Sequence, residues 1–203
     1  MNMKEEIKSM LLESSETKKK TAEQLSDKIE QVIRACVKCY QNGGKVLIFG
    51  NGGSAADSQH FAAEFVNRYK LDRPPMAAIA VTTDTSILTS IANDSGYEDV
   101  FKKPIEALCN KGDVVFAITT SDIDDRPGGH SANIARGLRA AREKGAVTVG
   151  LFSMKSKKVL EYVDIAIQVP STNTPRIQEA HIAIIHTVCE ILERELYQNA
   201  KVG

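Results

Sequence analysis

Apolar positions along the chain follow two different patterns. Between residues 25 and 40 they recur every three or four positions, for example at Ile29 and Val32, which predicts an amphipathic helix. Gly43 ends this pattern, because glycine reaches the left-handed conformation common after a helix without steric cost. Five other segments are apolar at successive positions, which is typical of strands covered on both faces: 45–49, 76–81, 114–119, 146–152 and 164–169.

Helical patterns separate most of these strands and also close the chain. They predict helices over 54–69, 84–92, 97–109, 131–144 and 174–198. The alternation predicts an α/β fold, a doubly wound three-layer αβα sandwich with a five-stranded mostly parallel sheet and N-terminal helices. We expect residues 1–203 to form a single domain, with 1–42 as a helical extension. In such a sheet, ligands bind at the carboxyl ends of the strands, in the loops that lead into helices.

Composition narrows the classes of partner. The chain has 26 Lys and Arg residues against 26 Asp and Glu, so its formal net charge is zero, which argues against nucleic acid or a membrane surface as partner. The first 20 residues lack the apolar core of a signal peptide, and no apolar run approaches the ~20 residues of a membrane span. Cys36 and Cys39 lie inside a helical pattern with no second ligand pair, so we interpret them as structural. We expect a cytoplasmic protein.

A glycine-rich turn follows the first strand directly. The sequence from Gly50 to Ala55, GNGGSA, opens a helix, and free amides at a helix start favour phosphate. It also fits the loose dinucleotide fingerprint, but no acidic residue follows at the usual distance of ~20 residues. Phosphate is therefore the favoured ligand, ahead of a nicotinamide cofactor and of a turn that binds no ligand. Calorimetry would detect the binding of a nicotinamide cofactor. A hydroxyl cluster at the end of the third strand, Thr119 to Ser121, suits the same anion or simply caps the next helix.

Histidines and carboxylates on two predicted helices are candidates for chemistry. His60 and Glu64 are four residues apart and share a helical face, so they can move a proton or hold one side of a metal ion. His181 and His186 are five apart, so only one of them should face a shared site. Gln178 and His186 are eight residues apart, which corresponds to ~12 Å along the helix axis. Both side chains can therefore bind the same ion only if the start of the helix is strained or if two subunits contribute.

Four longer motifs resemble the sugar isomerase (SIS) domain family, specifically the phosphoheptose isomerases. They are KVLIFGNGGSAAD at 45–57, QHFAAEFVNRY at 59–69, TTDTSILTSIANDSGYE at 82–98 and VPSTNTPRIQEAHIAIIH at 169–186. The resemblance runs from about residue 43 to the last helix. It implies an SIS domain and an aldose–ketose isomerase that converts D-sedoheptulose 7-phosphate to D-glycero-D-manno-heptose 7-phosphate through a cis-enediol, for surface polysaccharide precursors.

The resemblance also implies roles for individual residues. Glu64 matches the base that moves a proton between C1 and C2, and His186 matches the imidazole that assists ring opening. His60, Glu64, Gln178 and His186 match the set that binds one zinc ion per subunit in some members. Family members are homotetramers with sites built between subunits, in which we expect residues 1–42 to pack. The expected substrate contacts are Asn51, Gly52, Gly53, Ser54, Glu64, Asn93, Asp94, Thr119, Thr120, Ser121, Ser131 and Gln178.

The third loop departs from the family pattern. Residues 122–128, with three aspartates, stand between Ser121 and Ser131 where the family has a compact Thr-Ser-Gly-Asn-Ser turn, and His130 replaces the usual Asn or Lys. Three carboxylates beside a phosphate site repel the ligand unless the insert bulges outward. We therefore expect this insert to loop into solvent. Two alternatives then remain. Either Ser131 caps the following helix and completes the site, or the site binds phosphate more weakly.

A non-catalytic protein is the main alternative. The SIS family includes a bacterial replication-initiator partner that binds another protein and lacks the matching Glu and His. The presence of both Glu64 and His186 favours an enzyme.

Overall fold

Five strands form one sheet at the centre of the molecule. The computed structural model describes residues 2–126 and 128–198. The strands lie in the order β2-β1-β3-β4-β5, and each neighbouring pair is parallel, where the sequence predicted a mostly parallel sheet. Their positions agree with the five apolar segments: β1 Val46–Gly50, β2 Ala78–Ala80, β3 Val114–Ile118, β4 Val147–Ser153 and β5 Ile165–Val169.

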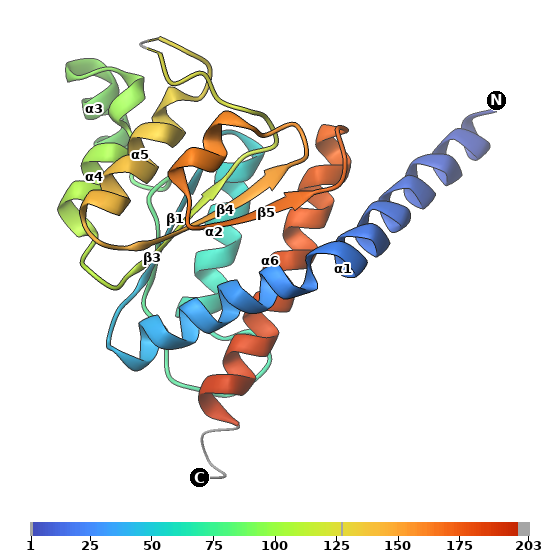
Figure 1. Cartoon of the computed structure of the whole chain (residues 1–203), viewed down its shortest axis with the longest axis horizontal. Coiled ribbons are helices and arrows are strands. Elements are labelled where there is room, and N and C mark those ends of the chain that lie inside the picture. The colour runs from blue at the N-terminus through green and yellow to red at the C-terminus, as the bar shows by residue number, and fades with distance from the viewer. Residues whose placement is uncertain (1, 127, 199–203) are drawn as a thin grey trace.

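Helices cover both faces of this sheet (Figure 1). One face carries α1 (Met3–Gln41), α2 (Gly53–Val66) and α6 (Thr174–Tyr197). The other carries α3 (Thr85–Asp94), α4 (Lys102–Leu108) and α5 (Ala132–Glu143), with the short 3₁₀ segments η1 (Tyr97–Asp99) and η2 (Lys158–Tyr162). The three-layer α/β sandwich expected from the sequence is confirmed.

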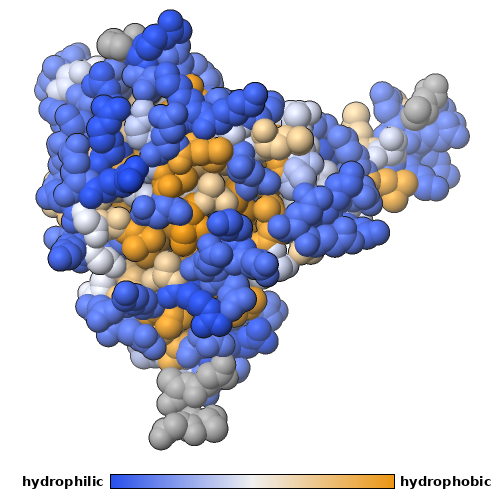
Figure 2. Space-filling view, in the orientation of Figure 1, coloured by the Kyte–Doolittle hydropathy of each residue, from blue (hydrophilic) through white to orange (hydrophobic). Residues whose placement is uncertain are grey.

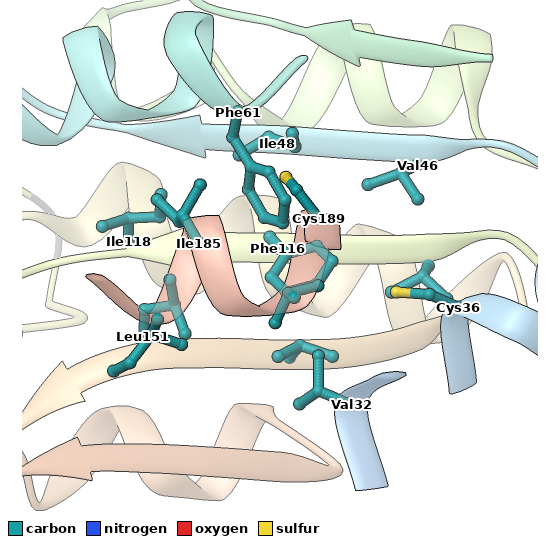
Figure 3. Packing of buried hydrophobic residues seen from close by; sticks show 14 of the residues in the cluster. Val32, Cys36, Val46, Ile48, Phe61, Phe116, Ile118, Leu151, Ile185 and Cys189 are labelled. Carbon is teal, nitrogen blue, oxygen red and sulfur yellow. The ribbon is translucent and has the colours of Figure 1, made fainter. Parts of the chain in front are cut away.

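Alternate residues of the central strands supply two separate cores. Ile48 and Phe116 belong to the cluster under α1, α2 and α6, where Figure 3 shows them beside Phe61 and Ile185. Phe49, one position after Ile48, belongs to the cluster on the other face. Successive residues of a strand point to opposite sides, so a sheet covered twice needs the unbroken apolar runs seen in the sequence.

Two helix predictions need correction. The N-terminal region is one continuous helix, α1, instead of several, and residues 3–41 contain no glycine or proline that would interrupt it. The expected helix over 97–109 is divided into η1 and α4. Pro104 explains the division, because its ring clashes with the carbonyl four residues earlier and prevents a continuous helix through residue 100. None of the helices in the described part of the chain is both long and apolar enough to span a bilayer.

Candidate active site

The glycine-rich turn lies at the carboxyl end of β1 and begins α2. Gly52 is at the N-cap position with φ 56° and ψ −121°, a conformation that favours glycine. Gly53 approaches α6 so closely that a Cβ there would lie 2.2 Å from Nε2 of Gln178. The turn therefore places two predicted substrate contacts, Gly53 and Gln178, next to each other. Ser54, a third, is buried and its carbonyl accepts a hydrogen bond from Oγ of Ser58.

A cavity of about 480 Å³ opens beside this turn. Asn51 and Asn133 exchange two amide hydrogen bonds of 3.0 and 2.9 Å at its wall, and the hydroxyl of Tyr97 donates to Asn51 over 3.3 Å. These bonds hold the Asn51 amide in one orientation. The lining residues are Asn51, Gly96, Tyr97, Glu98, Gly128, Gly129, His130, Ser131, Ala132 and Asn133.

The acidic insert packs against the molecule, so the expectation that it loops into solvent is wrong. Ile123 is buried, and the Asp122 carboxylate accepts hydrogen bonds from the amides of Lys158 and Val159 at the start of η2. Although partial burial opposes it, these and neighbouring amides hold the pKa of Asp122 below its usual value. Asp125 accepts a 2.6 Å hydrogen bond from the Tyr162 hydroxyl.

Cations balance the insert's other charges. Lys158 pairs with Asp125, and Arg126 pairs with Asp124. The Gly128 amide donates to Glu98 over 2.8 Å, so the insert also contacts η1. These contacts place one end of the insert in the cavity wall.

Ser131 occupies the N-cap position of α5, but its side chain makes no capping hydrogen bond. Of the two alternatives that the sequence left open for Ser131, the side-chain cap is therefore not formed. Its φ of 57° makes it the one non-glycine residue with positive φ in the described part of the chain. The left-handed conformation turns the end of the insert into α5 and leaves Ser131 in the wall of the cavity.

Five further predicted substrate contacts lie in the loop after β3 and at the end of α3. The Thr119 hydroxyl and Ser121 bond to each other, with Oγ1 3.3 Å from the Ser121 amide, and the Thr120 carbonyl accepts from Ser153. Asn93 and Asp94 end α3, both exposed, and are joined by a 2.7 Å hydrogen bond. None of these five residues lines the cavity beside Asn51.

Three titratable side chains from α2 and α6 meet in a row. Nε2 of His60 lies 3.1 Å from Oε1 of Glu64 and 3.1 Å from Nε2 of His186. Partial burial and the neighbouring His60 lower the pKa of His186, and Glu64 opposes them. Nε2 of His60 offers either one proton or one lone pair, so it hydrogen-bonds to only one of these two neighbours at a time.

Gln178 lies apart from this row. Contacts between α2 and α6 occur in the same order along both helices: Gly53 with Gln178, His60 with His186, and the residues after α2 with Glu193. The two helices are therefore parallel, and Gln178 is about two turns from His186. Three of the four predicted zinc ligands meet. Their donor types suit zinc, yet no three His, Cys, Asp or Glu side chains in residues 2–126 and 128–198 are arranged as a metal site.

The remaining histidine and cysteine predictions agree with the structure. His181 is fully buried, with Nε2 3.0 Å from the Phe152 carbonyl, and burial lowers its pKa to about 4. It therefore points away from His186, as the spacing predicted. Cys36 and Cys39 are buried free thiols, and burial raises the pKa of Cys39 to about 11. Both cysteines belong to the core.

The same architecture and motifs occur in known proteins. The family model described as SIS domain matches residues 11–153. The phosphoheptose isomerase of Geotalea daltonii is 46% identical over 195 residues, 96% of this chain and 98% of the relative. The structure of the phosphoheptose isomerase from Neisseria gonorrhoeae shares the fold, with 36% sequence identity and a TM-score of 0.85 over 95% of this chain and 99% of that one. The structure of a phosphoheptose isomerase from Francisella tularensis has 34% identity and a TM-score of 0.87 over 96% of this chain and 100% of that one. The chain therefore belongs to the SIS domain family and, within it, to the phosphoheptose isomerases.

Sequence reasoning missed one carboxylate near the row. Asp57 lies three residues before His60 and seven before Glu64, a spacing that places all three on one face of α2. Its Oδ2 is buried without a hydrogen-bond partner among the described residues. Burial raises the pKa of Asp57 to about 6, against the influence of His60. The helical spacing was a signal in the sequence that could have pointed to it, whereas its burial is evident only in the structure.

Proposed function

We propose that this enzyme, a phosphosugar isomerase, interconverts D-sedoheptulose 7-phosphate and D-glycero-D-manno-heptose 7-phosphate. The observation that carries the proposal is the row of Glu64, His60 and His186, in which groups 126 residues apart in sequence meet at 3.1 Å. A carboxylate beside two imidazoles is suited to moving a proton between carbon and oxygen atoms. The similarity to phosphoheptose isomerases over nearly the whole chain supports the choice of sugar.

The proton transfers assign a role to each group. Glu64 removes a proton from C1 of the open ketose, the C1–H electrons form the C1=C2 bond, and the C2 oxygen takes a proton to give the cis-enediol. The O1 hydroxyl then loses its proton, C1=O forms, and Glu64 returns its proton to C2. His186 exchanges protons with the sugar oxygens, and its lowered pKa keeps it largely neutral and able to accept one.

The phosphate is suited to the carboxyl edge of the sheet. The amides at the start of α2 and the hydroxyls of the loop after β3 donate hydrogen bonds without adding net charge. Such a site agrees with a chain whose formal charge is zero. The cavity beside Asn51 then receives part of the sugar chain.

Zinc is a further part of the proposal. His60, Glu64 and His186 supply two imidazoles and a carboxylate, and Gln178 would complete the set from a second subunit or after a helix shift. When bound, zinc supplies a Lewis acid that polarises a carbonyl. Elemental analysis of the purified protein tests this: one zinc per chain is expected, reduced strongly in His60→Gln. Equal metal content in both proteins contradicts the assignment.

We also propose a cytoplasmic homotetramer with sites shared between subunits. The first turns of α1 project from the body, where apolar side chains lie among hydrophilic ones (Figures 1 and 2). Ile7, Met10 and Leu11 are 54%, 53% and 68% exposed there, at positions that share one helical face. Such a stripe favours burial against another copy. Light scattering is expected to give four chains for the wild type and fewer for Leu11→Glu; a monomeric wild type contradicts the proposal.

Isotope exchange tests the reaction itself. In D₂O, the wild-type enzyme is expected to introduce deuterium at C1 or C2 of sedoheptulose 7-phosphate while the aldose product forms, both followed by NMR. Heat-denatured protein is the control. A protein that exchanges nothing, with or without added zinc, contradicts the isomerase proposal and favours a binding module.

A further inference from the structure

A buried ion pair closes the C-terminal end of the contact between α2 and α6. Nε of Arg73 lies 2.8 Å from Oε2 of Glu193, and each side chain is only 1% exposed. The two residues are 120 positions apart and join the loop after α2 to the end of α6. Taking two charges out of water is costly, so a pair this deeply buried calls for a reason beyond stability.

The Arg73 guanidinium binds the backbone of the residue that carries the proposed base. It donates to the carbonyl of Glu64 over 2.8 Å and to that of Phe65 over 2.9 Å. A third bond reaches the Pro74 carbonyl over 3.0 Å. The last carbonyls of a helix have no partner within the helix, so the guanidinium caps α2 at Glu64. Lysine cannot make this set of bonds, because it lacks the planar array of donors.

The Glu193 carboxylate organises the loop on the other side of the row. It accepts hydrogen bonds from the amides of Tyr69, Lys70 and Leu71 at 3.1, 2.7 and 2.7 Å. These amides and Arg73 outweigh the effect of burial and hold the pKa of Glu193 below its usual value, so the group stays ionised. The loop in turn places the Tyr69 ring 5.7 Å from the His186 ring.

One cluster therefore touches both ends of the row. Arg73 holds the backbone at Glu64, and Glu193 holds Tyr69 against His186. Glu193 also follows His186 by seven residues on α6, so the two lie on nearly the same helical face. The pair thus joins the loop after α2 to α6 beside the two helices that carry His60 and His186.

We propose that Arg73 and Glu193 are positioning residues that set the placement of Glu64 relative to His186. The proposal rests on the proposed isomerase function, in which these two groups act on the same substrate. It separates the pair from ordinary core residues, because it predicts a loss of turnover in a variant that stays folded.

The test replaces the pair with apolar residues of similar size. Replacing both residues avoids leaving one buried charge alone. The loop amides and the helix carbonyls still lose their partners, so Arg73→Met/Glu193→Leu is expected to melt several degrees below the wild type and to stay folded at the assay temperature. Its kcat is expected to fall about 10–100-fold with KM changed less than about threefold, since misplacement by ~1 Å costs about 100-fold. The NMR resonances of the His186 ring, which lies 5.7 Å from the Tyr69 ring, are expected to move at a fixed pH because the relative position of the two rings changes.

The neighbouring pair provides a matched control. Lys70 and Glu190 join the same loop to α6 at 2.7 Å, but their side chains are 58% and 39% exposed. Lys70→Met/Glu190→Leu removes a loop ion pair of the same kind without touching the Arg73 contact with Glu64. We expect less than about a twofold change in kcat.

Two results overturn the proposal. One is a folded Arg73→Met/Glu193→Leu variant with wild-type kcat and unchanged NMR resonances of the His186 ring. If that variant does not fold, Arg73→Lys decides: about a tenfold lower kcat supports the proposal, and wild-type kcat overturns it. A wild type without turnover refutes the proposed function instead. The His186 ring resonances, which are measured without substrate, then still test the positioning.

Discussion

The two ends of the contact between α2 and α6 are built from opposite kinds of residue. At the start of α2, a glycine backbone meets the neutral amide of Gln178. Two turns further on, Glu64, His60 and His186 form a titratable row, and beyond it Arg73 and Glu193 form a buried ion pair. The first end adjoins the helix N-terminus, which attracts anions, and the second adjoins the C-terminus, where a cation is favourable. In the proposed mechanism, one helix pair thus separates anion binding from proton transfer.

The largest expected effect comes from the charged end. Glu64→Gln keeps the side-chain shape but removes the base, so kcat is expected to fall by about 10²–10⁴-fold, with KM little changed. Steady-state kinetics with sedoheptulose 7-phosphate measure this. Glu190→Gln, a carboxylate on the adjoining surface of α6, is the control. Wild-type turnover in Glu64→Gln would remove Glu64 from the mechanism.

A smaller effect is expected at the neutral end. In Gly53→Ala the new Cβ occupies the place of the Gln178 amide, 2.2 Å away, and displaces it. The loss of one ligand hydrogen bond, about 1 kcal/mol, raises KM about fivefold to tenfold and leaves kcat nearly unchanged. In a double-mutant cycle, adding Gly53→Ala to Gln178→Ala is expected to cost nothing further. Additive losses would show that the two residues act independently.

The third prediction concerns Asp57, which lies between the two ends. Its pKa of about 6 in the folded state is above the ordinary value of 3.8 for an aspartate. The folded state therefore binds the proton more tightly, and stability falls as pH rises from about 4 to about 6. Asp57→Asn removes this loss. In metal-free samples, the melting temperature of the variant is therefore expected to be a few degrees above that of the wild type at pH 8 and equal to it at pH 4. Asp27→Asn, on an exposed part of α1, is expected to show no such difference.

The smallest effect is expected in the insert beside the neutral end. Asp125→Asn weakens the contacts with Tyr162 and Lys158. Because partly exposed pairs contribute little, we expect the melting temperature to fall by no more than about 2 °C and KM to rise about twofold. Thermal melts and kinetics measure both. A tenfold loss of kcat/KM would show that the insert contributes more to the reaction than its contacts in the cavity wall indicate.

Predictions from sequence succeeded where local pattern and environment agree. The strands were located because both faces of the sheet are covered, so their apolar runs are unbroken. The insert was misjudged because Asp, Pro and Gly are typical of solvated loops, whereas its partners Lys158 and Tyr162 lie over 30 residues away. Pro104 is a local signal for the division between η1 and α4. The prediction of one helix over 97–109 was based on hydrophobic periodicity and did not take this proline into account.

The sequence by itself determined the α/β class, the glycine-rich turn after β1 and the motifs that carry the family resemblance. These depend on the order of neighbouring residues, which sets helical faces and strand burial. Only the tertiary structure decided that His186 meets His60 while Gln178 lies two turns away. It also decided that Arg73 pairs with Glu193 and donates to the Glu64 carbonyl. Periodicity tells which face of a helix is turned inward. Which residues face each other across two helices depends on how both pack on the same side of the sheet.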